Sequence, residues 1–403
     1  MKWPEKSLSL VAEIIMGQSP PGKTYNEEGN GLPFFQGKAE FGSIYPFIKK
    51  WCSAPSRIAI KGDILLSVRA PVGPTNIAPC ESCIGRGLSA IRAKSEVAKQ
   101  EYLWFFFKYL EPILSKRGQG STFTAIKRSE INEIKIPVPP LSEQRRIVEI
   151  LNQADRLRKL REDADAISQR ILPSFFMKMF GNPVGNKGSW PIDKFGNVGT
   201  LERGKSKHRP RNDPILLGGP HPLIQTGDVA NSGGRIRNYT QTYSDIGLSQ
   251  SRMWPKGTLC ITIAANIART GVLEFDACFP DSVVGFHPGA DVTTEYVQAW
   301  LWFLQPVLEN NAPQAAQKNI NLKLLRDLPI PTPPKYLQDK FSGQVKNIYQ
   351  QRNYMQKAST KLEILFKSLL HRAFTGDLTA SWREAHMKEL LQEMELQARV
   401  LAS

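Results

Sequence analysis

Short strings in the first half of the chain recur in the same order about 190 residues later, which indicates an internal duplication. The displacement changes by only a few residues along the chain, as small insertions in loops would cause. One match of this length could arise by chance, but six in register indicate one unit built twice. The matching strings are Trp3-Pro4 with Trp190-Pro191, Gly17-Gln18-Ser19 with Gly204-Lys205-Ser206, Pro33–Gln36 with Pro222–Gln225, Lys61–Leu65 with Lys256–Cys260, Glu101–Leu103 with Glu295–Val297, and Ile136–Pro140 with Ile330–Pro334.

Before its proline-rich string, each copy mixes short alternating apolar runs with Gly, Pro and Asn turns, a pattern typical of short strands. We expect strands within Ile58–Val68 and Leu259–Ala264, and an internal helix at Glu101–Leu114 and Glu295–Leu308. These helices carry many aromatic side chains, which could stack on bases, but such density on a helix favours the core. They are Trp104, Phe105, Phe106, Phe107, Trp300, Trp302 and Phe303.

A long helix is expected after each proline-rich string, because proline does not continue inside a helix. In both helices, seam residues recur at alternating steps of three and four, the heptad pattern of a coiled coil. About thirty residues at a rise of 1.5 Å would give a rod of roughly 45 Å. Because a globular region separates the two helices, we expect them to pair antiparallel. The predicted seams are Ile147, Ile150, Ala154, Leu157, Arg161, Ala164, Ser168, Ile171 and Phe175, and Phe341, Val345, Ile348, Arg352, Met355, Ser359, Leu362, Phe366 and Leu369.

The chain is strongly basic, with 53 Lys and Arg against 37 Asp and Glu and a formal net charge of +16. Such a charge favours a polyanionic partner, because neutralising phosphates releases condensed counterions. No apolar signal core or membrane-length apolar run is present, and the five cysteines are few and odd in number. We therefore expect a cytoplasmic protein with free thiols and no membrane partner.

With this layout, the chain resembles the specificity (S) subunit of type I restriction–modification systems over essentially its whole length. The main string that carries the resemblance is IPVPPLSEQRRIVEIL at Ile136–Leu151, with a weaker echo at Leu328–Phe341. The second copy departs from the pattern, because Lys335–Asp339 replaces the usual Leu-x-Glu-Gln, which affects only the expected helix capping. Further similar strings are Leu369–Glu384, Ser174–Pro183, Gly204–Pro214 and Pro222–Val229.

The resemblance implies that each globular region is a target recognition domain that reads one half of a split double-stranded DNA site. The paired helices would act as a ruler and would dock two methyltransferase (modification) subunits. Restriction/translocase subunits would join that core. S-adenosylmethionine and ATP would be bound by these partners, and no cofactor by this chain. From the rod length we expect half-sites separated by about one DNA turn, since duplex rises 3.4 Å per base pair.

The expected fold class is α+β, with two mixed α/β target recognition domains joined by two long antiparallel coiled-coil helices in a pseudo-two-fold repeat. We expect recognition domain 1 at residues 1–140, the first conserved helix at 141–180 and, after a short leading linker, recognition domain 2 within 181–334. The second helix is expected at 335–374. The amphipathic tail, 375–403, is interpreted as a helix that docks on a partner subunit, although a frayed surface helix would have the same pattern.

Gly199–Ser206 fits the phosphate-loop pattern letter for letter, but that chemistry needs a helix directly after the lysine. Pro210 and Pro214 follow too closely for such a helix. The first copy also has Gln18 where the second has Lys205, so it lacks a lysine for a phosphate. We therefore interpret this string as a basic loop suited to DNA phosphates and base edges.

Other catalytic or metal-binding patterns are incomplete. Cys80 and Cys83 form a lone C-x-x-C without a second pair at zinc-finger spacing. Pro280-Asp281 lacks the downstream Lys of a nuclease triplet, and Glu133-Ile134-Lys135 precedes it. A methyltransferase would need an Asn/Asp-Pro-Pro-aromatic loop, which Gly181–Val184 does not supply. We predict no metal and no catalysis by this chain itself.

The residues predicted to contact DNA belong to loops that occupy matching places in the two copies and mix cations with amides or hydroxyls. As a set they favour DNA contact, although each alone could be a solvated surface residue. They are Gln18, Lys23, Tyr25, Lys38, Gln119, Ser121 and Lys127 in the first copy, and Lys205, Lys207, His208, Arg209, Arg211, Arg235, Arg237, Gln317 and Asn319 in the second.

Two rival functions remain open at this point. One is a DNA methyltransferase or restriction enzyme with fused recognition domains, against which the missing catalytic motifs count. The other is a non-catalytic coiled-coil scaffold without a DNA role, against which the charge and the duplicated loops count. Methylation by the chain alone would favour the first, and the absence of salt-dependent DNA binding would favour the second.

Overall fold

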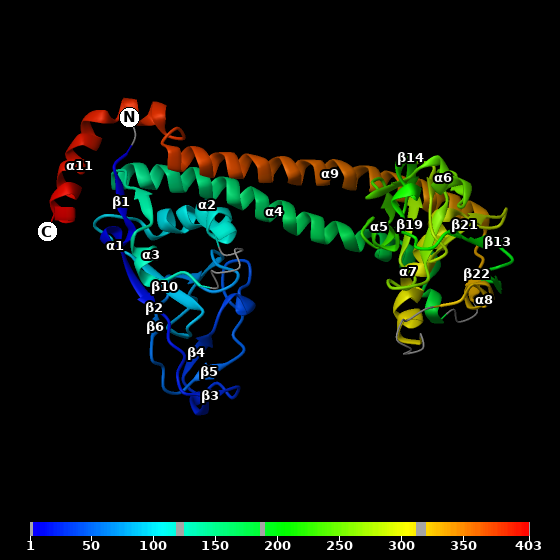
Figure 1. The fold of residues 1–403 in the computed structure, drawn as a ribbon, viewed down its shortest axis with the longest axis horizontal. Helices are drawn as coiled ribbons and strands as arrows, with labels where there is room; N and C mark the ends of the chain where they lie inside the picture. The colour runs from blue at the N-terminus through cyan, green and yellow to red at the C-terminus, as the bar shows by residue number, and fades with distance from the viewer. Residues whose placement is uncertain (1–2, 118–124, 186–189, 312–319, 403) are drawn as a thin grey trace. The chain divides into compact units, whose positions relative to one another are not determined.

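The computed structural model describes residues 3–117, 125–185, 190–311 and 320–402 (Figure 1). They form two compact units: unit 1 comprises Met1–Glu162 with Lys357–Ser403, and unit 2 comprises Asp163–Gln356. Helix α4 (Leu141–Phe180) begins in unit 1 and ends in unit 2, whereas α9 (Lys335–Thr375) begins in unit 2 and ends in unit 1. No helix within the described residues combines the length and apolar character needed to cross a membrane.

Unit 1 contains a central antiparallel sheet, a second sheet and a two-stranded ribbon. The central sheet has the order β2 (Ala12–Met16), β10 (Leu88–Ala93), β7 (Ile64–Ser67), β8 (Thr75–Ile77). The second has the order β3 (Tyr25–Asn26), β5 (Trp51–Cys52), β4 (Leu32–Phe35), β9 (Ser82–Ile84), β6 (Ile58–Ala59). The ribbon pairs β1 (Glu5–Ser7) with β11 (Lys135–Pro137).

Unit 2 repeats this plan. Its central sheet has the order β13 (Gly199–Arg203), β21 (Val283–Pro288), β18 (Leu259–Thr262), β19 (Thr270–Leu273), β15 (Arg235–Ile236). Its second sheet has the order β16 (Gln241–Tyr243), β14 (Leu217–Leu223), β20 (Ala277–Cys278), β17 (Met253–Trp254), and its ribbon pairs β12 (Ile192–Lys194) with β22 (Pro329–Pro331). Strand β14 pairs parallel with β20 as β4 does with β9. The pairing of the strands therefore confirms the duplication predicted from the sequence.

In each unit a long internal helix covers one face of the central sheet: α2 (Gln100–Arg117) in unit 1 and α7 (Thr294–Asn311) in unit 2. Alternate residues of a strand point to opposite faces. Accordingly, Ile64 and Leu66 of β7 pack in the cluster with α2, while Leu65 packs in the cluster with the second sheet. The aromatic residues of α2 and α7 are buried or packed against these clusters, which confirms their predicted place in the core.

The remaining helices are short, apart from the last. They are α1 (Leu8–Val11), α3 (Arg128–Asn132), α5 (Thr226–Ala230), α6 (Asp245–Ser249), α8 (Leu322–Asp327), α10 (Ala380–Ala385) and α11 (Met387–Ala402), with 3-10 turns η1 (Gly22–Thr24), η2 (Lys38–Glu40), η3 (Pro183–Gly185) and η4 (Pro214–Leu216).

Two glycines that match in the duplicated strings are required by close backbone contact. A Cβ on Gly17 would lie 2.1 Å from the carbonyl oxygen of Gly85, and one on Gly204 would lie 2.2 Å from that of Phe279. Gly17 directly follows β2 and Gly204 directly follows β13. At this point each chain segment passes close to the turn that connects the second sheet to the central sheet. The repeated Gly thus has a structural cause, and the residues that follow it are free to differ.

A buried glutamine at the start of each long helix makes the same hydrogen bonds in both units. Gln144 accepts from the N–H of Lys99 and donates to the carbonyls of Val97 and Pro139. Gln338 accepts from the N–H of Thr293 and donates to the carbonyls of Asp291 and Pro333. The departure from the family string at Lys335–Asp339 therefore leaves this capping arrangement intact.

Replacing Gln338 by alanine is expected to lower the free energy of unfolding by about 2 kcal/mol, because buried backbone groups would lose their partners. The loss should be smaller for Gln144→Ala, since Gln397 also donates to the Val97 and Pro139 carbonyls. Urea denaturation of the full chain measures both. Gln344→Ala, which removes an exposed glutamine of the same helix, is the control. Equal and negligible losses for all three variants would contradict this account.

Helices α4 and α9 pair antiparallel within each unit, as predicted. In unit 1, Arg158 contacts Glu363 at 2.9 Å and lies over the ring of Phe366, while Glu143 contacts Thr379 beyond the end of α9. In unit 2, Arg352 donates to the carbonyl of Ser168 at 2.5 Å, and Phe175 stacks on Phe341. In both units, residues of increasing number along α4 contact residues of decreasing number along α9, so the two helices run antiparallel.

Two of the nine predicted seam residues of the first helix are exposed, and the other seven are buried or half-buried. Leu157 is 54% exposed and Ile171 is 46% exposed. An unbroken series of buried or half-buried residues that also alternates in steps of four and three is Ile147, Leu151, Ala154, Arg158, Arg161, Asp165, Ser168, Leu172, Phe175 and Met179. The two series share every second residue, and where they differ α4 exposes Leu157 and Ile171 in favour of Arg158 and Leu172. The predicted seam of α9 contains only buried or half-buried residues.

The C-terminal segment packs on the rest of unit 1. Glu143, fully buried at the start of α4, forms a 2.8 Å ion pair with Arg383 of α10, which is 4% exposed. On α11, Glu393 accepts from the N–H and hydroxyl of Ser142, and Gln397 donates to the Val97 carbonyl. The helix was expected, and one of its faces contacts this chain itself. Docking of the exposed face, with Leu391, Leu396 and Val400, on a partner subunit stays a prediction.

Candidate nucleic-acid interface

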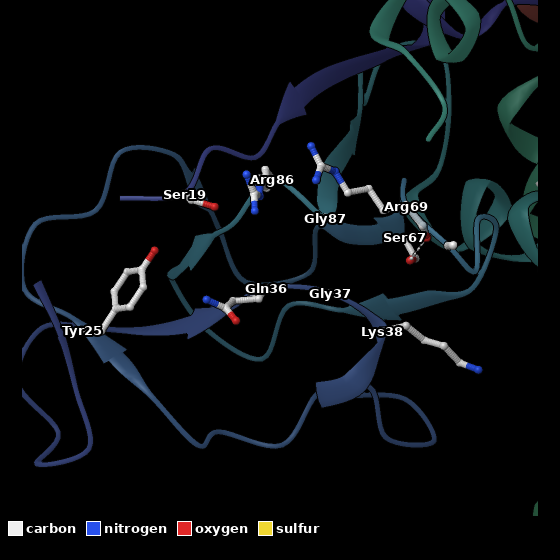
Figure 2. A pocket seen from close by; sticks show the side chains of 10 residues that line it. Ser19, Tyr25, Gln36, Gly37, Lys38, Ser67, Arg69, Arg86 and Gly87 are labelled. Carbon is white, nitrogen blue, oxygen red and sulfur yellow. Dashed lines mark hydrogen bonds between the residues drawn. The ribbon is translucent and has the colours of Figure 1, made fainter. Parts of the chain in front are cut away.

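In unit 1 the ends of four strands meet around an open hollow of about 450 Å³ (Figure 2). Ser19 follows β2, Gln36 and Lys38 follow β4, Arg69 follows β7, and Arg86 lies between β9 and β10. Ser67 at the end of β7 donates to the carbonyls of Arg69 and Pro71, which holds the turn beneath Arg69. The hollow is therefore built by rigid strand ends rather than by one long loop.

The hollow is strongly cationic. Lys38, Arg69 and Arg86 all line it and all three side chains are exposed. Within the part of the chain that the structure describes, no carboxylate forms an ion pair with any of them. Three uncompensated cations around one concave surface favour a polyanion such as a nucleic-acid backbone.

The predicted contact residues of the first copy divide into three groups. Tyr25 and Lys38 line the hollow. Gln18, Lys23 and Lys127 are exposed elsewhere in unit 1, Gln18 directly before Ser19 and Lys127 at the start of α3. Gln119 and Ser121, like Gln317 and Asn319 of the second copy, lie outside the described residues. All of these remain predictions.

In unit 2 the predicted basic loop directly follows β13. The N–H groups of Lys207 and His208 both donate to the side chain of Gln250, at 2.6 and 3.1 Å. His208 contacts Asp213 at 2.9 Å. The N–H of Ile215 and the His208 ring together hold the pKa of Asp213 below its usual value. The string that resembles a phosphate loop begins as the strand Gly199–Arg203, so these residues do not form a phosphate cradle.

Two arginines of this loop converge on one aspartate. Arg211 contacts Asp281 at 2.5 Å and Arg209 contacts it at 3.6 Å, and Arg209 also donates to the carbonyls of Ser206 and His208. Both arginines are about half exposed. Their charged groups are therefore oriented by the protein and still accessible to a ligand.

Arg235 and Arg237, predicted as a second cationic pair, lie in different surroundings. Arg235 is only 9% exposed, pairs with Glu295 at 3.0 Å and lies over the ring of Tyr349. Arg237 is exposed and pairs with Glu274 at 3.2 Å. Burial and a carboxylate partner give Arg235 a structural role in this conformation, so of the two only Arg237 has its charge at the surface.

Sequence reasoning missed Arg69, Arg86 and Gln36. For Arg86 a signal was present, since glycines on both sides of an arginine indicate a turn that packs closely on its neighbours. For Gln36 the signal was its match with Gln225 in the duplicated string. Arg69 gave none, because only the fold brings the end of β7 beside the other strand ends.

The cysteine pair Cys80-x-x-Cys83 does not act as a unit in the fold. Cys83 of β9 lies near Cys52 of β5, the two strands on either side of β4, and burial together with that second thiol raises the pKa of Cys83 to about 12. Among the described residues, no three His, Cys, Asp or Glu side chains lie close enough together to hold a metal ion.

The chain contains two copies of one α/β domain. Each copy has a cationic surface at its strand ends and a long helix after its proline-rich string. This arrangement is that of a duplicated DNA-recognition protein. The chain belongs to the type I restriction modification DNA specificity family, whose domain matches residues 1–166 and again residues 189–363. This confirms the resemblance drawn from the sequence.

Individual relatives carry the same description. A candidate MjaX specificity subunit of a type I restriction enzyme from Methanocaldococcus jannaschii is 44% identical over 164 residues, covering 40% of this chain and 39% of the relative. The EcoDI specificity subunit from Escherichia coli is 23% identical over 331 residues, covering 71% of each chain. The chain thus spans about two fifths of the first of these relatives and about seven tenths of the second.

Solved structures agree on the fold. The S subunit of a type I restriction-modification system from M. genitalium covers 93% of this chain and 96% of its own, with a TM-score of 0.58 at 15% identity. A chain from a structure on complex assembly of the type I R-M system covers 94% of this chain with a TM-score of 0.60 at 18% identity.

Proposed function

We propose that this chain is the DNA-specificity subunit of a type I restriction–modification complex, in which each recognition domain reads one half of a split duplex site. One observation carries the proposal: the two units share sheets, helices and capping hydrogen bonds, yet carry different cationic side chains at the same strand ends. A common scaffold with different contact residues is what reading two different half-sites requires.

For the division of the chain we propose recognition domains at residues 1–140 and 181–334 and conserved helices at 141–180 and 335–374. If the paired helices set the spacing, the half-sites are separated by about one turn of duplex. Contiguous target sequences, or gaps of two or more turns, would contradict that geometry.

The long helices offer surfaces for partner subunits. In unit 1, Leu157, Leu160 and Ile364 are 54%, 55% and 62% exposed, and in unit 2, Ile167 is 65% exposed. Large apolar side chains exposed on a helix favour burial against another protein. We propose that methyltransferase subunits dock here, that they bind S-adenosylmethionine, and that ATP-dependent restriction/translocase subunits join them. The chain itself would carry out no catalysis.

Arg209→Ala is expected to weaken or relax recognition of one half-site only, because Arg209 belongs to the basic loop of unit 2. A lost bidentate contact to a base would reduce discrimination by about 1–3 kcal/mol. Competition binding of the full chain to duplexes altered in either half measures the effect. Arg170→Ala, an exposed arginine of α4 in the same unit, is the control. Equal damage at both half-sites would show that the units do not read one half each.

The rival functions have their own tests. Methylation of duplex DNA by the purified chain with S-adenosylmethionine and no partner would show an enzyme with fused recognition domains. Failure of the full chain to bind duplex at low salt would leave only a scaffold role.

A further inference from the structure

One position in the turn between the two sheets is equivalent in the two units but carries opposite charge. Arg86 and Asp281 each come three residues after a cysteine, Cys83 or Cys278, that pairs with the parallel neighbouring strand. Each also comes two residues before the first paired residue of the next strand: Leu88 pairs with Ser67, and Val283 with Thr262. The turns have the same length and the same anchors, so the charge reversal is a true difference at one site.

In unit 1 this turn is fixed in place and presents its arginine to the hollow. The N–H of Gly85 donates to the carbonyl of Phe35 at 2.8 Å, and a Cβ on Gly87 would lie 2.2 Å from the carbonyl oxygen of Gln36. Arg86 therefore lies beside Gln36, and the close contacts of Gly85 and Gly87 hold its backbone in place. Figure 2 shows both side chains at the hollow, while the ammonium group of Lys38 extends away from them.

In unit 2 the same turn presents a carboxylate, which accepts the two arginines of the basic loop. Arg209 and Arg211 contact Asp281, and the loop backbone is held separately by Gln250. The neighbouring glutamine is kept as Gln225, which donates to Gln241 at 3.0 Å. In unit 1 the turn itself carries the cation, Arg86. In unit 2 the turn carries Asp281, which holds two arginines of the basic loop at the equivalent place by ion pairing.

We infer that this position determines base preference in both half-sites: Arg86 contacts a guanine of the half-site read by unit 1, and Asp281 positions Arg209 and Arg211 for the half-site read by unit 2. The inference rests on the proposed function and adds the residues and the base to it. An arginine fork matches the two major-groove acceptors of guanine, O6 and N7. Arg86 has the exposure and the rigid backbone that such a contact needs.

The experiment selects binding sequences from randomised duplexes with the full chain and its variants. Arg86→Ala and Arg86→Lys remove the fork, and the lysine variant keeps the charge. We expect both to lose about tenfold or more of the preference for guanine at one base pair of one half-site, with the other half-site unchanged. Asp281→Asn should relax only the other half-site. Arg146→Ala, an exposed arginine on α4 in unit 1, is the matched control, and equal melting temperatures check the fold.

The outcomes separate the inference from the proposed function. If the unaltered chain selects no split sequence, the proposed function fails. If it selects one and Arg86→Ala lowers affinity equally for all sequences, Arg86 contacts phosphate only and the inference is overturned. A guanine preference that Arg86→Lys retains in full would also overturn it, because a lysine cannot form the fork. Relaxation of both half-sites by Asp281→Asn would overturn the positioning role.

Discussion

The affinity of the full chain for duplex DNA is expected to fall by about a thousandfold or more when salt is raised from about 50 to 200 mM. Each unit places several exposed cations at its strand ends: Lys38, Arg69 and Arg86 in unit 1, and Lys207 and Arg209 among those of unit 2. Phosphate contacts release counterions, so the logarithm of the affinity falls linearly with the logarithm of the salt concentration. Titration of a labelled duplex at several salt concentrations gives the slope.

Variants identify which cations contribute to the slope. Lys207→Ala should weaken binding to all sequences and reduce the slope by about one if the lysine contacts a phosphate. Lys178→Ala removes an exposed lysine of α4 in the same unit and should leave the slope unchanged. A slope near zero for the unaltered chain would contradict a phosphate-contacting surface of this size.

Replacing Glu143 by alanine is expected to destabilise unit 1 by about 3–5 kcal/mol, because Arg383 would be left buried without its carboxylate. The pair is almost fully buried, and Arg383 also donates to the carbonyl of Gly376 and lies over the ring of Trp3. Loss of the pair should release α10 and α11 from unit 1. Urea denaturation gives the stability, and amide hydrogen exchange of α10 and α11 reports their release.

Two further variants show whether the charge is the cause. Exchanging both partners for apolar residues, Glu143→Leu with Arg383→Met, should restore most of the stability, because a buried pair contributes little beyond an apolar contact of similar volume. Glu149→Ala breaks an exposed pair with Arg146 and should cost less than about 1 kcal/mol. If Glu143→Ala were as mild as Glu149→Ala, the buried pair would not anchor the C-terminal segment.

Much of the fold could be predicted because the two copies could be compared with each other. Proline marked where each long helix begins, and the strings shared by the copies marked positions that the scaffold fixes, such as Gly17 and Gly204. The seam of α4 could not be chosen in the same way. Leu157, Ile167 and Ile171 are as apolar as residues that α4 buries, and sequence alone does not say which of them face α9 and which stay exposed.

The candidate site was only partly predictable. The basic loop of unit 2 is continuous in sequence and could be found by composition, whereas the hollow of unit 1 gathers Gln36, Arg69 and Arg86 from three separate strand ends. Arg235 was a plausible contact by charge, but its burial against Glu295 depends on the packing of α7. The amphipathic tail likewise gave no sign that part of it would pack on the start of α4 in the same chain.

Sequencing of methylated bases in the genome of the host, with and without this chain, tests the central claim most directly. We expect one split methylated motif that requires the chain, and a change confined to one half of that motif in the Arg209→Ala strain. A contiguous motif, or a methylation pattern that does not depend on the chain, would contradict it.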